Sequence, residues 1–274
     1  MAGIILASET EAKTMIGWQS ALGRHGAFAL AVCLASGSAA SGAEDAAEFL
    51  AGRTKACVKC ALEKAQLKRR DLAGADLSGA NLARAVLHRA RLVGTNFTGA
   101  DLEGANLNKT DLKNAVFGNS KAAGAMFYES DMSVANLAGA DLTEAKMGKA
   151  RLVRAVLDDA KLADAILTGA RLDDASLRRA ELMRANLIGV SLRGANLEGA
   201  NLEDSGLIDA VMREANLKGA NLSGADLFGA DLTGANLAGA DLSESRLSRA
   251  ILTDANLTGA NLKGALMPDG SVHE

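Results

Sequence analysis

The sequence predicts an all-β solenoid, a chain wound into stacked coils, and three observations support this prediction. From residue 60 to residue 269 a large apolar residue recurs at every fifth position, with Ala122 as the exception. A small residue, usually Ala, lies two positions before it. No insertion or deletion interrupts the 42 fives that these 210 residues make. Self-similarity of this kind indicates a repeat architecture.

A period of five matches neither a helix nor a strand. In a helix every fifth residue turns by about 140°, which would spread the apolar side chains over all faces. In a strand they would alternate between the two faces. A chain that turns a corner every five residues points them all toward one axis. Four fives then make a square coil of 20 residues, so residue n lies beside residue n+20, about 4.8 Å away.

The other positions of each five agree with a corner. The large apolar residue is numbered i. Gly is frequent at i+2, as at Gly74 and Gly79, where a tight turn benefits from its conformational freedom. Asn and Asp recur at i−1, where they favour turns and can bond local backbone. We therefore expect the inner positions i and i−2 to form the core and the other three to face outward.

These fives resemble the pentapeptide-repeat family, whose motif is A-(D/N)-L-x-x. Clear copies are Ala-Asp-Leu-Ser-Gly at 75–79 and Ala-Asn-Leu-Lys-Gly at 260–264. The resemblance covers residues 60–269 and implies a right-handed quadrilateral β-helix, here of about ten 20-residue coils. The handedness is an implication of the family, because the spacing predicts only a square coil.

Residues 1–59 lack the five-residue period, and residues 1–43 have the pattern of a signal peptide. Arg24 and His25 precede a short apolar run at 27–35, and small residues follow it. Cleavage after Ala40 or after Ala43 fits equally well, and Met15 is an alternative start to Met1. The other interpretation is an apolar helix that packs on the rod. The run is too short to span a bilayer.

A short amphipathic helix is expected next, at about 44–56, as part of an N-terminal cap over 44–59. The first coil of a solenoid exposes apolar core and unpaired backbone, so an end cap is physically required. Residues 270–274 form only a short tail. The last coil has no obvious cap beyond Pro268, so a homodimer through a coil end stays open.

Cys57 and Cys60 lie where the cap meets the first coil. If Cys33 is removed with a signal peptide, they are the two cysteines left, which favours a disulfide in an exported protein. Free thiols are the alternative. A redox centre in residues 1–59 is a third interpretation, although the βαβ context of such motifs is missing. Two ligands alone do not make a structural zinc site.

The 20-residue coil also predicts columns of side chains on the outer surface. Charges alternate in one column, Asp158, Arg178, Glu198 and Lys218, and in another, Asp164, Arg184 and Asp204. A candidate interaction surface consists of Ile188, Ile208 and Phe228 in one column with Met183 on the adjacent side. Scattered harmless apolar residues are the alternative explanation.

The chemistry of an enzyme is not apparent. The three histidines, His25, His88 and His273, have no nucleophile or metal ligand at a useful spacing, and no phosphate loop occurs. We predict no catalytic residue, metal or other cofactor. The net charge of −3 implies no bulk attraction to nucleic acid.

The sequence therefore predicts a non-enzymatic binding or scaffold protein in an exported compartment, periplasmic, with an unidentified protein partner. The alternative comes from the family, whose best-understood members mimic DNA and protect gyrase from quinolones. This chain departs from them because residues 60–269 carry 25 basic and 27 acidic residues, so the rod is nearly neutral. It also has no inserted loop and no appended dimerisation helix. An exported protein would not meet gyrase.

Overall fold

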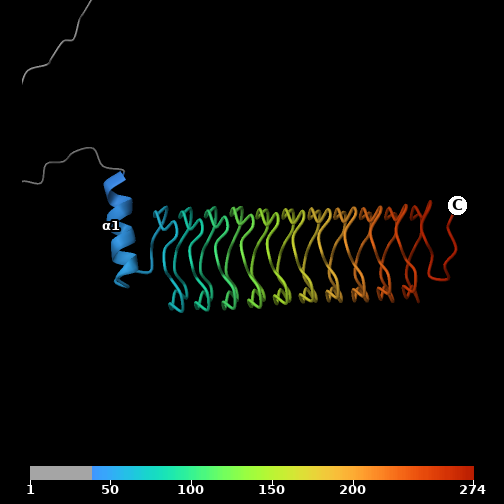
Figure 1. The fold of residues 1–274 in the computed structure, drawn as a ribbon, viewed down its shortest axis with the longest axis horizontal. Coiled ribbons are helices and arrows are strands. Elements are labelled where there is room, and N and C mark those ends of the chain that lie inside the picture. Colours follow the sequence, from blue (N-terminus) through green and yellow to red (C-terminus); the bar gives the residue numbers. More distant parts are fainter. Residues whose placement is uncertain (1–38) are drawn as a thin grey trace, which may run out of the picture. The chain divides into compact units, whose positions relative to one another are not determined.

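The computed structural model describes residues 39–274, which contain one helix, α1 (Ala39–Leu50), followed by a regular coil. Figure 1 shows the coils repeating along one axis from cyan to red. Isolated parallel bridges join each residue at i−1 to the residue 20 positions later, from Ala56 with Asp76 to Arg246 with Leu266. The predicted solenoid and the predicted pairing of n with n+20 are therefore confirmed.

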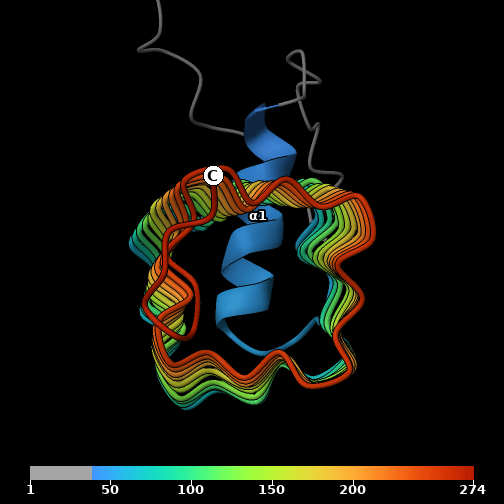
Figure 2. The same cartoon turned by 90° about the vertical axis from the view of Figure 1, so that its right-hand side faces the viewer.

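The coil is four-sided, and each side pairs with its neighbours through one residue only. Figure 2, which looks along the coil, shows the square outline. Residues 56–266 therefore form single bridges rather than extended strands. A turn follows every bridge within two residues, which leaves no room for a longer strand.

One five shows how the backbone is satisfied. In residues 80–84 the N–H of Ala80 closes a turn onto the Leu77 carbonyl at 3.1 Å. The second, third and fifth N–H groups donate to carbonyls of the coils before and after. The fourth N–H, of Ala83, donates to Oδ1 of Asn81 at 3.0 Å. Asn or Asp at i−1 therefore supplies the one acceptor that neighbouring coils do not, which gives this position of the motif a physical reason.

The residue at i+2 adopts a left-handed backbone conformation in every five from residue 59 to residue 264. The hydrogen bond across the corner and the positive φ at its third residue are the features of a type II turn. Gly occupies many of these positions, but 24 carry a side chain. One is Val134, a β-branched residue at φ 61°. Such residues rarely adopt this conformation.

The core consists of the side chains at i and i−2, as predicted. The small residue Ala122 lies between two large ones, Phe117 and Phe127, and all three are fully buried. The rings of Phe117 and Phe127 meet edge to face with their centroids 6.1 Å apart, and Phe117 stacks on Phe97 of the preceding coil at 4.8 Å. Large neighbours thus fill the volume that Ala122 leaves.

Helix α1 begins and ends earlier than the helix expected at about 44–56. Gly52, at φ 75°, follows the helix, and its N–H donates to the Phe49 carbonyl while that of Arg53 donates to the Glu48 carbonyl. This pair of bonds is a Schellman motif, which ends a helix. Phe49 is 1% exposed and belongs to the same buried cluster as Cys57, so the helix packs on the coil through this side chain.

At the other end the chain turns back on itself. Val272 forms an antiparallel bridge with Leu266, and the N–H of Gly264 donates to the His273 carbonyl at 2.7 Å. The short tail therefore covers one side of the last coil. Leu252, Leu257 and other inner residues of that coil remain half-buried.

The expected signal segment, including Arg24, His25 and the run at 27–35, lies outside the described residues. Both expected cleavage positions, Ala40 and Ala43, fall within α1. Within residues 39–274 no helix is both long enough and apolar enough to cross a membrane.

Candidate interaction surfaces

The predicted apolar column lies on the outside of the coil. Ile188 is 38% exposed, and Ile208 and Phe228 are half-buried. Met183, on the adjacent side, is also half-buried. The turn bonds fix two members of the column, because Asn186 accepts the N–H of Ile188 at 3.2 Å and Asp226 accepts that of Phe228 at 3.1 Å.

Two cations flank the end of this column. The guanidinium of Arg246 lies 4.4 Å from the centre of the Phe228 ring, and that of Arg249 lies 5.4 Å from it. Both distances permit a cation–π attraction. The column is therefore apolar in its middle and basic at its C-terminal end.

More apolar residues share this side of the coil than the sequence analysis identified. They are Tyr128 and Ile166, 38% and 42% exposed, with Val86 and Met126 half-buried. Tyr128 lies in the column of Ile188, three coils earlier, and the other three lie in the column two positions before it, so the 20-residue coil could have revealed them. Inspection of a single column does not find them, because three of the four lie outside the column of Ile188.

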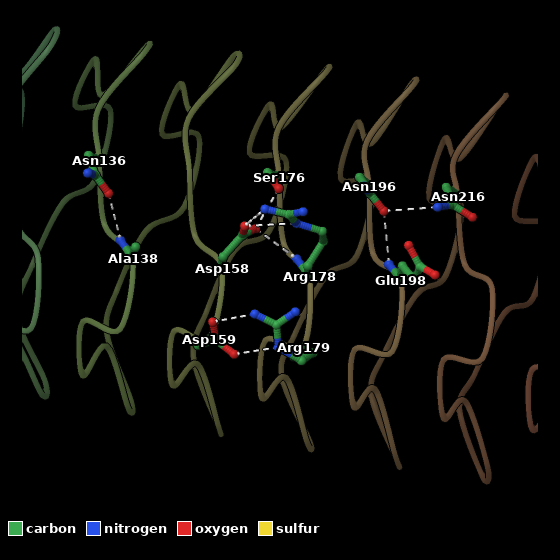
Figure 3. A network of polar contacts seen from close by, with 10 residues as sticks. All are labelled: Asn136, Ala138, Asp158, Asp159, Ser176, Arg178, Arg179, Asn196, Glu198 and Asn216. Atoms are coloured by element: carbon green, nitrogen blue, oxygen red, sulfur yellow. Dashed lines mark hydrogen bonds and ion pairs between the residues drawn. The ribbon is translucent and has the colours of Figure 1, made fainter.

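The charged columns form real ion pairs. Asp158 accepts hydrogen bonds from the main-chain N–H of Arg178 at 3.1 Å, from its Nε at 2.9 Å, and from its Nη2 (Figure 3). Ser176 Oγ donates to the same carboxylate. Asp158 is the one charged side chain among the described residues that is buried, at 8% exposed. Burial alone would raise the pKa of Asp158, but bonds from Arg178 and Ser176 outweigh it and lower that pKa.

Neighbouring pairs are more exposed. Arg179 binds Asp159 through two parallel hydrogen bonds of 2.8 and 2.7 Å, beside the pair of Asp158 (Figure 3). Arg184 binds Asp164 in the same way, at 2.9 and 2.7 Å. Exposed pairs like these contribute little to stability.

The remaining members of the predicted columns interact weakly. Lys218 and Glu198 are 4.0 Å apart, the limit of an ion pair. Asp204 makes no ion pair with Arg184 within the described chain. The closer Asp164 raises the pKa of Arg184 most, and Asp204 adds to this increase only through Coulomb attraction.

Cys57 and Cys60 have their sulfur atoms at disulfide distance, as predicted. The residues stand at the two ends of a corner, where the N–H of Cys60 also donates to the Cys57 carbonyl at 3.3 Å. They are 1% and 0% exposed and belong to the same buried cluster as Phe49. Because the bond is buried, it is suited to join the end of the helix region to the first coil and not to exchange with a substrate thiol.

In residues 39–274 no group of three or more His, Cys, Asp or Glu side chains converges as a metal site would require. His88 is instead surrounded by cations, and burial followed by Arg89, Lys68 and Lys109 lowers its pKa.

Comparison with protein families identifies the repeats. The model of the pentapeptide repeats matches eight copies, over residues 60–133 and 135–267. The chain belongs to the pentapeptide-repeat family, and its solenoid is the fold of that family.

Solved structures include similar chains. HetL, a pentapeptide repeat protein involved in heterocyst differentiation regulation from the cyanobacterium Nostoc sp. strain PCC 7120, is 34% identical, with a TM-score of 0.53. The match covers 83% of this chain and 97% of HetL. QnrB1, a plasmid-mediated fluoroquinolone resistance protein, is 19% identical with a TM-score of 0.26, over 72% of this chain and 86% of that one. No curated protein matched.

Proposed function

We propose that this protein is a non-enzymatic binding or scaffold protein that acts through the outer faces of a right-handed quadrilateral β-helix of about ten coils. Its inner side chains fill the coil completely, so recognition has to use the outer faces. The observation that carries the proposal is the outward column of Ile188, Ile208 and Phe228 on a surface where most columns hold polar or charged residues. Apolar surface of this kind marks contact sites.

The exported compartment is part of the proposal. It is supported by the basic flank, apolar run and small residues of the N-terminal segment, and by the cysteine pair at disulfide distance. Helix α1, with Phe49 buried against the first coil, serves as the N-terminal cap. The relative with a TM-score above 0.5, HetL, is described by a regulatory role and not by a reaction.

Site-specific photo-crosslinking in living cells tests the proposal. A photoreactive amino acid at position 188 or 208 should give a discrete adduct, whereas the same residue at position 93 or 153, in an outward column of another side, should give none. Val93 and Val153 are half-buried like Ile208, which makes them matched controls. Equal labelling at all four positions would contradict binding through the column.

The compartment is tested by mass spectrometry of the protein from cell fractions, with and without reduction. A chain starting near Glu44 in the exported fraction, with a mass two hydrogens below that of its reduced form, is the expected result. A chain starting at Met1 or Met15 in the cytoplasm, with free thiols, would overturn export. The gyrase-binding alternative would then be examined first.

A homodimer through the C-terminal coil is a second proposal, supported by a specific observation. The N–H groups of Leu252, Leu257 and Leu262 have no hydrogen-bond partner among residues 39–274, and their side chains are half-buried. Unpaired backbone beside apolar surface favours edge-to-edge pairing. Analytical ultracentrifugation should show a dimer that Leu257→Glu dissociates. A monomer at all concentrations would rule it out.

A further inference from the structure

One side of the coil has an unusual combination of charge and apolar surface. The basic face is the side whose outer columns start at Gln66, Lys68 and Arg69 and repeat every 20 residues. It carries eight lysines and arginines against four acids, although the whole chain has a net charge of −3. These basic residues are Lys68, Arg69, Arg89, Lys109, Lys146, Lys149, Arg246 and Arg249.

Few of these cations are neutralised by the face's own acids. Lys109 pairs with Glu129 at 3.2 Å, and Arg246 pairs with Asp226 at 3.1 Å. The other six have no ion pair with any residue of the described chain, and four of them lie beside no acid of their own column. The face therefore presents free positive charge to solvent.

The order of charges within one column supports a binding role. Arg69, Arg89 and Lys109 follow one another on successive coils without an acid between them. Other outer columns of residues 60–269 carry at most two like charges in succession, as at Arg193 and Arg213, or alternate, as in Asp158 with Arg178. Like charges on neighbouring strands destabilise a sheet, so this column has a cost that packing does not explain.

The same face holds the longest series of apolar side chains on the outside of the coil. Ile188, Ile208 and Phe228 are joined by Tyr128 and Ile166. Free cations lie on both sides of this series along the axis, at Arg69 and Arg89 before it and at Arg249 after it. The face is flat because stacked coils of one size build it (Figure 2).

We propose that the basic face docks on an anionic phospholipid bilayer. Flat apolar surface flanked by lysine and arginine is what a peripheral membrane site requires, since the apolar groups enter the headgroup region and the cations meet lipid phosphates. A protein partner would have to be equally flat and acidic over several coils. The inference rests on the proposed function, because it names the partner of the face that contains the Ile188 column.

Vesicle sedimentation tests the inference on the protein as it is recovered from expressing cells. Vesicles of phosphatidylglycerol and phosphatidylcholine at about 1:2 should bind it, and pure phosphatidylcholine should bind it far less. Binding should weaken when salt rises from about 0.05 M to about 0.5 M, which shortens the Debye length. Free inorganic phosphate at equal ionic strength should not release the protein. Phosphate can compete only for the cations, and it does not replace the contact of the apolar column with the lipid.

Paired variants locate the binding to the face. Arg69→Gln with Arg89→Gln should weaken binding roughly 30-fold, since each cation near a charged leaflet contributes about fivefold. Arg193→Gln with Arg213→Gln removes two exposed, consecutive arginines from another side and should change binding less than about twofold. Ile188→Ser with Ile208→Ser should weaken binding too, whereas Val93→Ser with Val153→Ser should not.

The outcomes separate this inference from the proposed function. The apolar run at 27–35 is common to all variants, so it cannot produce a difference between them. No binding to anionic vesicles, or equal losses in both arginine pairs, overturns the membrane inference. If position 188 then crosslinks to a protein in cells, the proposed function stands without it. If neither vesicles nor crosslinks depend on this face, both proposals are wrong.

Discussion

Asp158 accepts the main-chain N–H of Arg178 from the neighbouring coil, at 3.1 Å. In half of the fives this N–H donates to Asn or Asp two residues earlier, but that position is Ser176 here. Asn108 does the same for the N–H of Tyr128, at 2.8 Å, where Met126 replaces the usual residue. An outward acid or amide on one coil can therefore replace a missing acceptor on the next.

Removal of the Asp158 carboxylate should destabilise the coil. Asp158→Ala leaves the N–H and guanidinium of Arg178 without their acceptor, and we expect a loss of about 2 kcal/mol in the free energy of unfolding. Urea denaturation at neutral pH measures it. Asp159→Ala is the matched control, because its pair with Arg179 is exposed and should contribute much less. Equal losses would show that burial of Asp158 has no energetic effect.

The contribution of Asp158 should also depend on pH. Its pKa in the folded chain is lowered, so the carboxylate stabilises the fold fully above the unfolded pKa of about 3.9. The stabilisation is lost as the pH falls through the lower folded pKa. The difference in stability between wild type and Asp158→Ala should stay constant from about pH 7 to about pH 5 and shrink below about pH 4. A difference that grows on acidification would contradict the assignment.

Val134 should be a site where substitution stabilises the protein. Its φ of 61° is unfavourable for a β-branched residue, and its side chain is 46% exposed, so little packing is lost on replacement. Val134→Asn should raise the free energy of unfolding by about 1 kcal/mol, because Asn tolerates this conformation. Asn114 already occupies the same column. Val153→Asn, where φ is not positive, should give no such gain.

Two buried serines should respond to alanine with opposite signs. Ser205 Oγ is buried without a hydrogen-bond partner, whereas Ser245 Oγ donates to the Leu242 carbonyl at 2.6 Å. Ser205→Ala should stabilise the protein by about 1 kcal/mol, and Ser245→Ala should destabilise it by about 1 kcal/mol. Thermal denaturation of both variants measures the signs. Destabilisation by Ser205→Ala would mean that its hydroxyl is satisfied in solution.

The cysteine pair should stabilise the protein moderately. The closed loop is short, so loop entropy gives about 2 kcal/mol in the chain-entropy model. Cys57→Ala with Cys60→Ala should lower Tm and make it insensitive to reductant, whereas the wild type should lose a similar amount on reduction. A wild-type Tm that is unchanged by complete reduction would contradict this prediction.

The sequence was sufficient to predict the coil because all its corners obey one rule. Counting in fives gives the inner residue at every i. Counting in coils of 20 residues gives the neighbour of each residue, including the pair of Asp158 with Arg178. The end of the helix was less predictable. The amphipathic pattern suggested a longer helix, but the hydrogen bonds from the N–H groups of Gly52 and Arg53 to the carbonyls of Phe49 and Glu48 end it earlier.

The candidate surface was only partly predictable. The column of Ile188 follows from the period, but the position of Arg246 over the Phe228 ring depends on side-chain rotamers that spacing does not specify. The return of Val272 onto Leu266 was also unforeseen, because the tail lies outside the repeat and its path depends on a backbone turn after Pro268. Partner chemistry depends on the whole face, which no single motif encodes.

The two ends of the coil are finished unequally, and this has a consequence for how the protein comes apart. Each coil contacts only its neighbours, so stability propagates along one dimension. Phe49 and the cysteine pair close the first coil, while the last coil keeps half-buried leucines such as Leu257. Opening should start as fraying at the C-terminal coil and move inward. Amide hydrogen exchange would then be graded along the axis, and a protease could shorten the rod from that end while the remaining coils stay folded.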